Sequence, residues 1–199
     1  MFSIDQLIKY KQYLNTIQQY LDKCFEDQAE YIFCKSGCAH CCKNGVYPYS
    51  ELEFEYLMTG FFNLPKDKQI LVKQKIDKIK TDLLSATNNK KYYHACPFLS
   101  DDDKCLVYDY RGIICRNFGI LQIDSNNNVS MPFCETMKLN YSNIYNDEKE
   151  KFDYNKVKEL GLKNPPKPFP VSRNLLMDKD LFADEPLNFG ETKPLAKWF

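Results

Sequence analysis

Apolar and polar positions follow a helical period in two long segments of the chain. The first stripe lies along one face of an opening helix and consists of Leu7, Tyr10, Leu14, Ile17, Leu21 and Cys24. The second follows Pro65, runs from Lys66 to about Thr87, and consists of Val72, Ile76, Ile79 and Leu83. Lysines occupy many of the intervening positions, and we interpret them as a solvated face because the chain has no net charge.

Shorter elements are predicted from local signals. Ser50 and Glu53 form a capping-box pattern that predicts a helix ending near Gly60. Apolar segments 120–124 and 129–133 flank the polar stretch 125–128, which predicts a β-hairpin leading into Cys134. A short helix is expected over 110–115, and another over 155–160 that ends at Gly161. The predicted class is mainly α, with irregular cysteine-rich loops and a small β-hairpin, in one domain of mixed α+β type.

Two stretches lack helical periodicity and contain most of the nine cysteines. The first reads CKSGCAHCC from Cys34 and is followed by Gly45 and Pro48, which favours an irregular loop. The second, between Tyr92 and Phe118, contains three aspartates at 101–103 that indicate a turn. Cys24 belongs to the first apolar stripe, so we interpret it as a packing residue.

Composition and charge narrow the classes of function. Lys+Arg and Asp+Glu are both 27, so no long-range field attracts nucleic acid or anionic lipid, and we expect neither as a partner. No apolar run is long enough to span a bilayer, and the opening residues lack the apolar core of a signal peptide. We therefore expect a cytoplasmic protein. In that reducing compartment structural disulfides rarely persist, so the cysteines require another explanation.

Metal ligation by thiolates explains the remaining eight cysteines best. Four cysteines in one short polar loop have little opportunity for apolar burial. The predicted ligands are Cys34, Cys38, Cys41, Cys42, Cys96, Cys105, Cys115 and Cys134. Cys41 and Cys42 are adjacent, so their side chains diverge and we expect them to serve different ions, or one of them to lie outside the coordination sphere. His40 and His94 are alternative ligands, and His40 is the better candidate.

Arginine is rare in this chain, and two of its three arginines lie close to Cys115. Thiolates around a divalent ion leave net negative charge, and a guanidinium can donate hydrogen bonds to sulfur or to nearby carbonyls. We therefore predict that Arg111 and Arg116 support the metal centre from outside its ligand set. An ordinary ion pair with Asp109 or Asp101 is the alternative.

These blocks resemble the YkgJ-type cysteine-cluster family, described as a zinc- or iron-chelating domain. The resemblance spans residues 34–134 and rests on CKSGCAHCC, YSELEF, CPFL, CLVYDYRGIICRNF and Cys134. It implies metal binding by eight cysteines, with zinc or an iron-sulfur cluster as the cofactor. The family usually has proline after the arginine where this chain has Gly112, which we expect to loosen that turn.

The blocks are also similar to those of flagellin lysine N-methylases, which are thought to use an iron-sulfur cluster and S-adenosylmethionine. Three functions therefore remain open. The first is a metal carrier, sensor or electron-transfer module; the second is a cluster-dependent group-transfer enzyme; the third is a zinc-stabilised module that binds a protein partner. Residues 1–150 are expected to form the metal-binding domain, and residues 151–199 a helix and a proline-rich strap that pack on it, with Trp198 and Phe199 as anchors.

Overall fold

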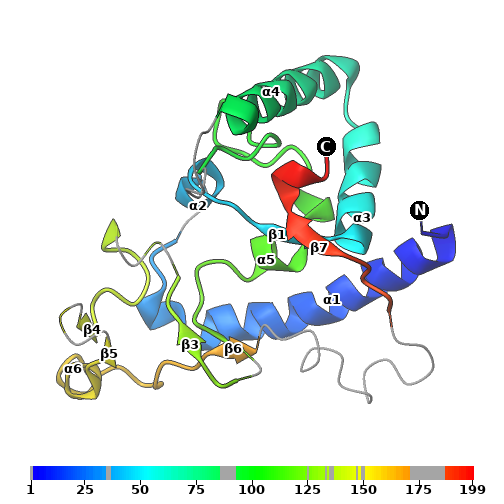
Figure 1. The fold of residues 1–199 in the computed structure, drawn as a ribbon. Helices are drawn as coiled ribbons and strands as arrows, with labels where there is room; N and C mark the ends of the chain where they lie inside the picture. The colour runs from blue at the N-terminus through cyan, green and yellow to red at the C-terminus, as the bar shows by residue number, and fades with distance from the viewer. Residues whose placement is uncertain are drawn as a thin grey trace. The chain divides into compact units, whose positions relative to one another are not determined.

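The computed structural model describes residues 2–34, 37–85, 93–124, 126–132, 134, 137–146, 148, 151–170 and 187–199. The chain divides into two compact units. The first unit comprises Met1–Leu14, Gly37–Arg116 and Leu187–Phe199, and the second comprises Asn15–Ser36 and Asn117–Pro186. Helices predominate and the strands are short, which confirms the predicted class of mainly α structure with a small β component (Figure 1).

Both predicted amphipathic stripes are found on helices. Helix α1 (Ile4–Asp27) contributes Tyr10 and Leu14 to the first unit, where both side chains are buried. Ile17 and Leu21 continue the stripe and are buried in the second unit. Helix α4 (Lys66–Ser85) buries Val72, Ile76 and Ile79, and the last predicted residues of its segment, Ala86 and Thr87, lie outside the described residues.

Helix α3 (Glu51–Phe62) begins with the predicted capping box. The Ser50 hydroxyl accepts from the Glu53 amide at 3.3 Å, and the Glu53 carboxylate accepts from the Ser50 amide at 2.9 Å. The helix ends at Phe62, near the predicted end at Gly60. A Cβ at Gly60 would lie 2.5 Å from the Tyr110 ring, so the glycine allows that ring to pack closely against the helix.

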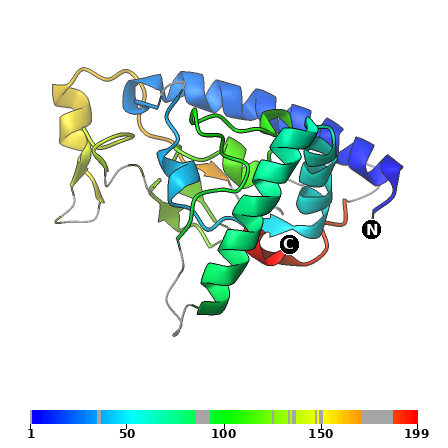
Figure 2. The ribbon, with the colours of Figure 1, turned by 90° about the horizontal axis from the view of Figure 1, so that it is seen from above.

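A two-stranded sheet joins distant parts of the first unit. Strand β1 (Pro48–Ser50) pairs antiparallel with β7 (Thr192–Pro194), and both views show the C-terminal residues beside β1 (Figures 1 and 2). The Trp198 indole stacks on Phe54 at 5.3 Å between ring centroids, and its Nε1 donates to the Tyr49 carbonyl at 3.0 Å. The C-terminal aromatic residues thus hold the end of the chain against the segment that follows the first cysteine block.

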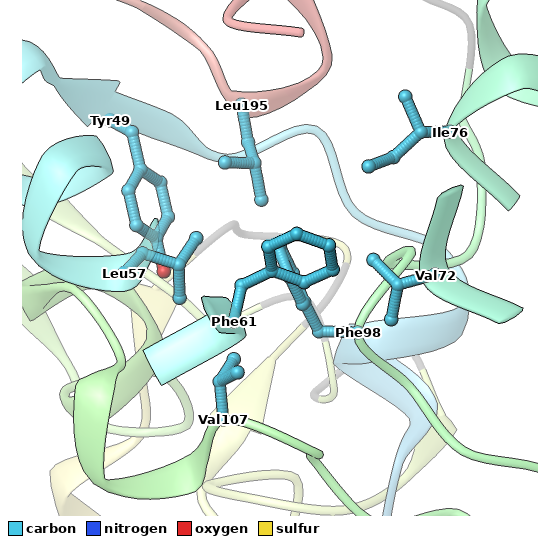
Figure 3. Packing of buried hydrophobic residues seen from close by; sticks show 8 residues of the cluster. All are labelled: Tyr49, Leu57, Phe61, Val72, Ile76, Phe98, Val107 and Leu195. Atoms are coloured by element: carbon cyan, nitrogen blue, oxygen red, sulfur yellow. The ribbon is translucent and has the colours of Figure 1, made fainter. Parts of the chain in front are cut away.

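The core of the first unit is an apolar cluster drawn from two of its segments, Gly37–Arg116 and Leu187–Phe199 (Figure 3). Its buried members are Tyr49, Leu57, Phe61, Val72, Ile76, Phe98, Val107 and Leu195. Cys96, Cys105 and Cys115 are half-buried and pack against this cluster. The apolar core and the cysteines of the second block are therefore adjacent, so packing of the core positions the sulfur atoms.

The second unit contains the predicted hairpin. Strands β2 (Gln122–Ile123) and β3 (Val129–Ser130) are antiparallel, and Asp124 accepts from the amides of Asn126 and Asn128 within the connecting turn. Ser125 and Phe133 of the prediction lie outside the described residues. Strand β6 (Phe169–Pro170) adds to β2 in parallel, which the hydrophobic pattern alone did not indicate.

A second apolar cluster, in the second unit, contains two stacked tyrosines. The rings of Tyr31 and Tyr141 lie 5.6 Å apart within a core completed by Leu121, Ile144 and Val157. Strands β4 (Tyr145–Asn146) and β5 (Lys151–Phe152) pair antiparallel and lead into helix α6 (Tyr154–Glu159). The proline-rich run that follows is held by Gln28, which accepts from the Lys167 amide at 3.0 Å.

Two elements differ from the sequence prediction in the loops. Cys41 and Cys42 lie on a helical turn, α2 (His40–Lys43), rather than in the predicted irregular loop. Helix α5 (Ile113–Arg116) follows a 3-10 turn over Tyr108–Tyr110, slightly later than predicted. Among the described residues, no helix has the length and apolar character that crossing a membrane requires.

Candidate metal centre

The structure divides the eight predicted ligands between the two units. Six of them, Cys38, Cys41, Cys42, Cys96, Cys105 and Cys115, belong to the first unit, whereas Cys34 and Cys134 belong to the second. All nine cysteines are thiols, with no disulfide among them. Cys24 is a half-buried residue of α1 in the second unit, and burial together with nearby Asp27 raises its pKa.

The first cysteine block is fixed to the second by its backbone. The Cys96 amide donates to the Cys42 carbonyl at 2.7 Å, which joins α2 to the start of the CPFL segment. The Tyr47 hydroxyl donates to the Cys41 carbonyl. On a helical turn successive side chains are about 100° apart, so Cys41 and Cys42 still point in different directions.

A tight turn brings Cys105 back beside Cys96. Leu99 and Cys105 form an isolated β-bridge, and the Ser100 hydroxyl donates to the Lys104 carbonyl across the turn at 2.8 Å. Asp103 adopts a φ of 61°, a conformation that aspartate tolerates better than most residues. The predicted turn over 101–103 therefore returns the chain so that Cys105 lies beside Cys96.

Backbone amides donate to two of these sulfur atoms. Cys96 accepts hydrogen bonds from the amides of Phe98 and Leu99, and Cys105 accepts one from Val107. An N–H donor favours the charged form of its acceptor, and each of these bonds lowers the pKa of its thiol. Amides aimed at sulfur in this way suit thiolates, and hydrogen bonds to sulfur are one means by which proteins tune thiolate metal centres.

Helix α5 places Cys115 through contacts with β1 and α3. The Ile113 amide donates to the Glu53 carboxylate at 3.1 Å, and the Gly112 amide donates to the Tyr49 hydroxyl at 3.1 Å. The Tyr49 hydroxyl in turn lies 3.2 Å from the Cys115 sulfur. Gly112 therefore serves a purpose that proline could not, because its N–H completes this chain of hydrogen bonds. Glu53 and Tyr49 support the site although sequence reasoning assigned them no role there, and only the capping box drew attention to Glu53.

Four cysteines of the first unit interact electrostatically with one another, and a fifth, Cys42, interacts with the Tyr47 phenol. Cys115 interacts with Cys105 and Cys41, and Cys96 interacts with Cys115 and Cys105. The Tyr47 phenol interacts with Cys41, Cys115, Cys42 and Cys96, and burial followed by these neighbours raises its pKa well above the ordinary value. Segments separated by many residues in the sequence therefore converge around the Tyr47 side chain.

Burial dominates the acid-base behaviour of this group. It is the largest cause raising the pKa values of Cys96, Cys105 and Cys115, the last to about 12. The Arg111 charge acts in the opposite direction on Cys105 and Cys115. Without a cation the three thiols are thus neutral near pH 7, and a bound metal would supply the positive charge that favours thiolates.

The two arginines next to Cys115 bind backbone carbonyls. Arg111 donates to the carbonyls of Tyr108 at 2.8 Å and Cys115 at 3.4 Å, and its guanidinium lies 3.4 Å from the Tyr108 ring centroid. Arg116 donates to the carbonyls of Arg111 at 2.9 Å and Asp109 at 2.7 Å. Both side chains therefore shape the loop that presents Cys115, and Arg111 also places positive charge near Cys105 and Cys115.

The histidines differ in their surroundings. His94 lines a cavity of about 10 Å³ together with Tyr47, Cys96 and Leu195, whereas His40 begins α2. A cavity of this size accommodates about one water molecule. His94 forms an isolated β-bridge with Gly45, and its Nδ1 lies 2.9 Å from the Ala95 carbonyl. Of the two candidates, His94 is the one that borders a cysteine of the second block.

The second unit holds Cys34 and Cys134 beside a buried amide. The two thiols are hydrogen-bonded to each other, and the Asn140 Nδ2 donates to the Cys34 sulfur at 3.2 Å. The hydrogen bond to Cys34 and burial raise the pKa of Cys134 far above its ordinary value. Asn140 is fully buried, and the sequence contains no motif that singles it out.

The cysteines of the first unit are neighbours, but their described side chains do not form a coordination sphere. Within the described parts of the chain, no three or more His, Cys, Asp and Glu side chains are arranged to hold a metal ion. The donor chemistry nevertheless fits a thiophilic metal, because several sulfur atoms from different loops meet beside amide donors and a guanidinium. Fold and site together define a small cysteine-rich domain of the metal-chelating class.

The family comparison gives this class a name. Residues 33–135, just over half of the chain, match the model of the CxxCxxCC family, described as "Putative zinc- or iron-chelating domain". The chain belongs to this family, and it is a protein that binds zinc or iron through cysteine. No significant match to the chain is found among curated proteins or solved structures.

Removal of the Tyr49 hydroxyl should weaken the metal centre while leaving its ligands in place. In the Tyr49→Phe variant the Gly112 amide loses its acceptor and the Cys115 sulfur loses its hydrogen-bonding partner, so we expect zinc affinity to fall about tenfold. Chelator competition measures the affinity. Tyr108→Phe is the control, because Tyr108 is exposed and contacts Arg111 through its ring, and it should leave the affinity unchanged. Equal affinity in wild type and Tyr49→Phe would contradict this role.

Proposed function

We propose that the six cysteines of the first unit form the metal centre, with Cys41, Cys96, Cys105 and Cys115 as its principal ligands. The observation that carries this proposal is the electrostatic coupling of these four residues, which come from three separate segments. Cys38 and Cys42 flank Cys41 on the first block and are candidates for the remaining coordination positions. When bound, zinc would act as a structural ion, and an iron-sulfur cluster would supply electron transfer.

The surroundings of the sulfur atoms favour a binding module over an enzyme with a substrate at the metal. The cavity beside Cys96 has space for about one water molecule, which is far below the volume of an ordinary ligand pocket. Arg111 and Arg116 are directed toward carbonyls of their own loop, where they stabilise the segment that carries Cys115. We therefore propose a metal carrier, sensor or electron-transfer module, in which these arginines offset thiolate charge.

Purification of the full chain without oxygen, followed by metal and sulfide analysis, tests this proposal. Iron with inorganic sulfide would support an iron-sulfur module, and zinc without sulfide would support a zinc carrier or a structural zinc site. Cys24→Ala is the matched control and should keep the metal content of wild type, because Cys24 belongs to the second unit. A folded product that contains no metal and takes up neither zinc nor iron would overturn the proposal.

Zinc affinity should increase steeply with pH because the metal competes with protons for the thiols. Cys96, Cys105 and Cys115 have pKa values raised above 9.0 in the metal-free fold, so each binds a proton at pH 6–8 and releases it on ligation. Affinity is therefore lowest at acid pH and should rise about tenfold per pH unit for each such thiol, or about a thousandfold for three. Chelator competition at several pH values measures the slope.

The pH dependence also has an internal control. The Cys105→Ser variant lacks one titrating ligand, so its slope should be smaller by one proton, whereas Cys24→Ala should keep the wild-type slope. An affinity that does not change between pH 6 and 8 would show that these thiols are not ligands.

A further inference from the structure

The pair formed by Cys34 and Cys134 is built differently from the cysteines of the first unit. Cys34 is exposed, Cys134 is buried with 4% of its surface accessible, and their thiols are hydrogen-bonded to each other. The second unit contains no histidine, and its remaining cysteine, Cys24, lies on α1. Two hydrogen-bonded thiols are the components from which a disulfide forms.

The Asn140 side chain forms hydrogen bonds with both the backbone amide and the sulfur of the exposed Cys34. Its Oδ1 accepts from the amides of Phe33 at 2.9 Å and Cys34 at 3.2 Å. Its Nδ2 donates to the Cys34 sulfur at 3.2 Å and to the Gly119 carbonyl at 2.6 Å. A donor of this kind stabilises a thiolate, which is the nucleophile in thiol–disulfide exchange.

The backbone at Gly119 makes room for this arrangement. Gly119 has a φ of 99°, which residues with a side chain rarely adopt. A Cβ at this position would lie 2.9 Å from the Asn140 Nδ2 and 3.6 Å from the Cys34 sulfur. The glycine, the buried amide and the two cysteines therefore form one site, which brings together three distant stretches of the sequence.

We propose that Cys34 and Cys134 form a redox-active dithiol that exchanges with small-molecule disulfides. The Cys34 thiolate attacks one sulfur of a low-molecular-weight disulfide, so that a mixed disulfide forms and one small thiol leaves with a proton. The Cys134 thiolate then attacks the Cys34 sulfur, which breaks the mixed disulfide and releases the second small thiol. Two protein thiols are oxidised by two electrons, and one disulfide is reduced to two thiols.

The difference in exposure between the two cysteines indicates which of them reacts first. Cys34 is accessible to the incoming disulfide, whereas Cys134 is buried and hydrogen-bonded to the Cys34 thiol. Cys34 is thus the attacking residue and Cys134 the resolving residue. Asn140 is a positioning residue, because it orients Cys34 without contacting the small disulfide.

Oxidised glutathione, applied to the full chain and followed by thiol blocking and peptide mass spectrometry, tests the proposal. Wild type should give a Cys34–Cys134 disulfide, and Cys134→Ser should stop at a glutathione adduct on Cys34. Cys34→Ser should give neither product. Asn140→Asp keeps the acceptor for the Phe33 and Cys34 amides but loses the donor to sulfur, so exchange at Cys34 should slow about tenfold.

The metal content of the same variants separates this inference from the proposed metal centre. Cys34→Ser and Cys134→Ser should bind as much metal as wild type, and Cys24→Ala should form the disulfide as wild type does. If either serine variant lost the metal, the pair would belong to the metal centre and the inference would fail while metal binding stood. A wild-type protein in which oxidised glutathione links neither cysteine to the other would also overturn it. A protein that bound no metal but formed this disulfide would leave the inference intact.

Discussion

Replacement of Cys115 by serine should lower zinc affinity at least about a hundredfold, since loss of a direct ligand should exceed the effect of losing an outer hydrogen bond. Cys115 is the residue on which the contacts of the site converge. It interacts electrostatically with Cys105 and Cys41, and its sulfur lies 3.2 Å from the Tyr49 hydroxyl. Serine keeps the size of the side chain but supplies an oxygen that is protonated at neutral pH and a poor ligand for a thiophilic metal. Chelator competition with zinc measures the loss.

The control for this substitution must remove a half-buried thiol without removing a proposed ligand. Cys24→Ser meets that requirement, because Cys24 is half-buried in α1 and belongs to the second unit. We expect Cys24→Ser to destabilise the fold slightly and to bind zinc as wild type does. If Cys115→Ser bound zinc with wild-type affinity, Cys115 would not be a ligand, and the proposed set would have to be rebuilt around the other cysteines.

Glu53→Ala should lower the free energy of unfolding of the metal-free protein by about 3 kcal/mol. The Glu53 carboxylate is buried and accepts from the Ser50 amide at 2.9 Å, the Ser50 hydroxyl at 2.7 Å and the Ile113 amide at 3.1 Å. Alanine leaves these donors without an acceptor in an apolar surrounding, and it separates α3 from the segment that carries Cys115. Urea unfolding followed by circular dichroism measures the change.

Glu53→Gln is the matched variant, because it preserves the shape of the side chain and one carbonyl oxygen. It should cost about 1 kcal/mol, since one of the hydrogen bonds to an amide is lost and the others are weaker. Equal stability of wild type and Glu53→Ala would show that the carboxylate does not join α3 to α5. A large loss for alanine with little loss for glutamine would identify hydrogen bonding, rather than charge, as the source of the stability.

The sequence predicted the elements whose signals are local. The stripes of α1 and α4, the capping box at Ser50 and the turn in the β2–β3 hairpin all arise from residues close in the chain. Gly60 shows the limit of such signals. The helix was predicted to end near Gly60 and ends at Phe62, but the packing of the Tyr110 ring against Gly60 was not predicted. That contact joins distant residues and has no local signature.

The site shows the same division between local and distant information. Spacing identified the cysteines, and the family match supports their use in metal binding. Spacing could not show that Cys34 meets Cys134, because tertiary folding decides that pairing. Tyr49 and Asn140 act through hydrogen bonds to sulfur from far along the chain, and tyrosine or asparagine in a loop gives no advance sign of such a contact.

The central claim is that thiolates of the first unit hold the metal, and zinc X-ray absorption spectroscopy tests it most directly. The measurement uses the Cys34→Ser/Cys134→Ser double variant loaded with one equivalent of zinc, so that the first unit supplies the proposed sulfur ligands. Our account predicts a first coordination shell dominated by sulfur at about 2.3 Å. A shell composed of nitrogen or oxygen at about 2.0–2.1 Å, without sulfur, would contradict it.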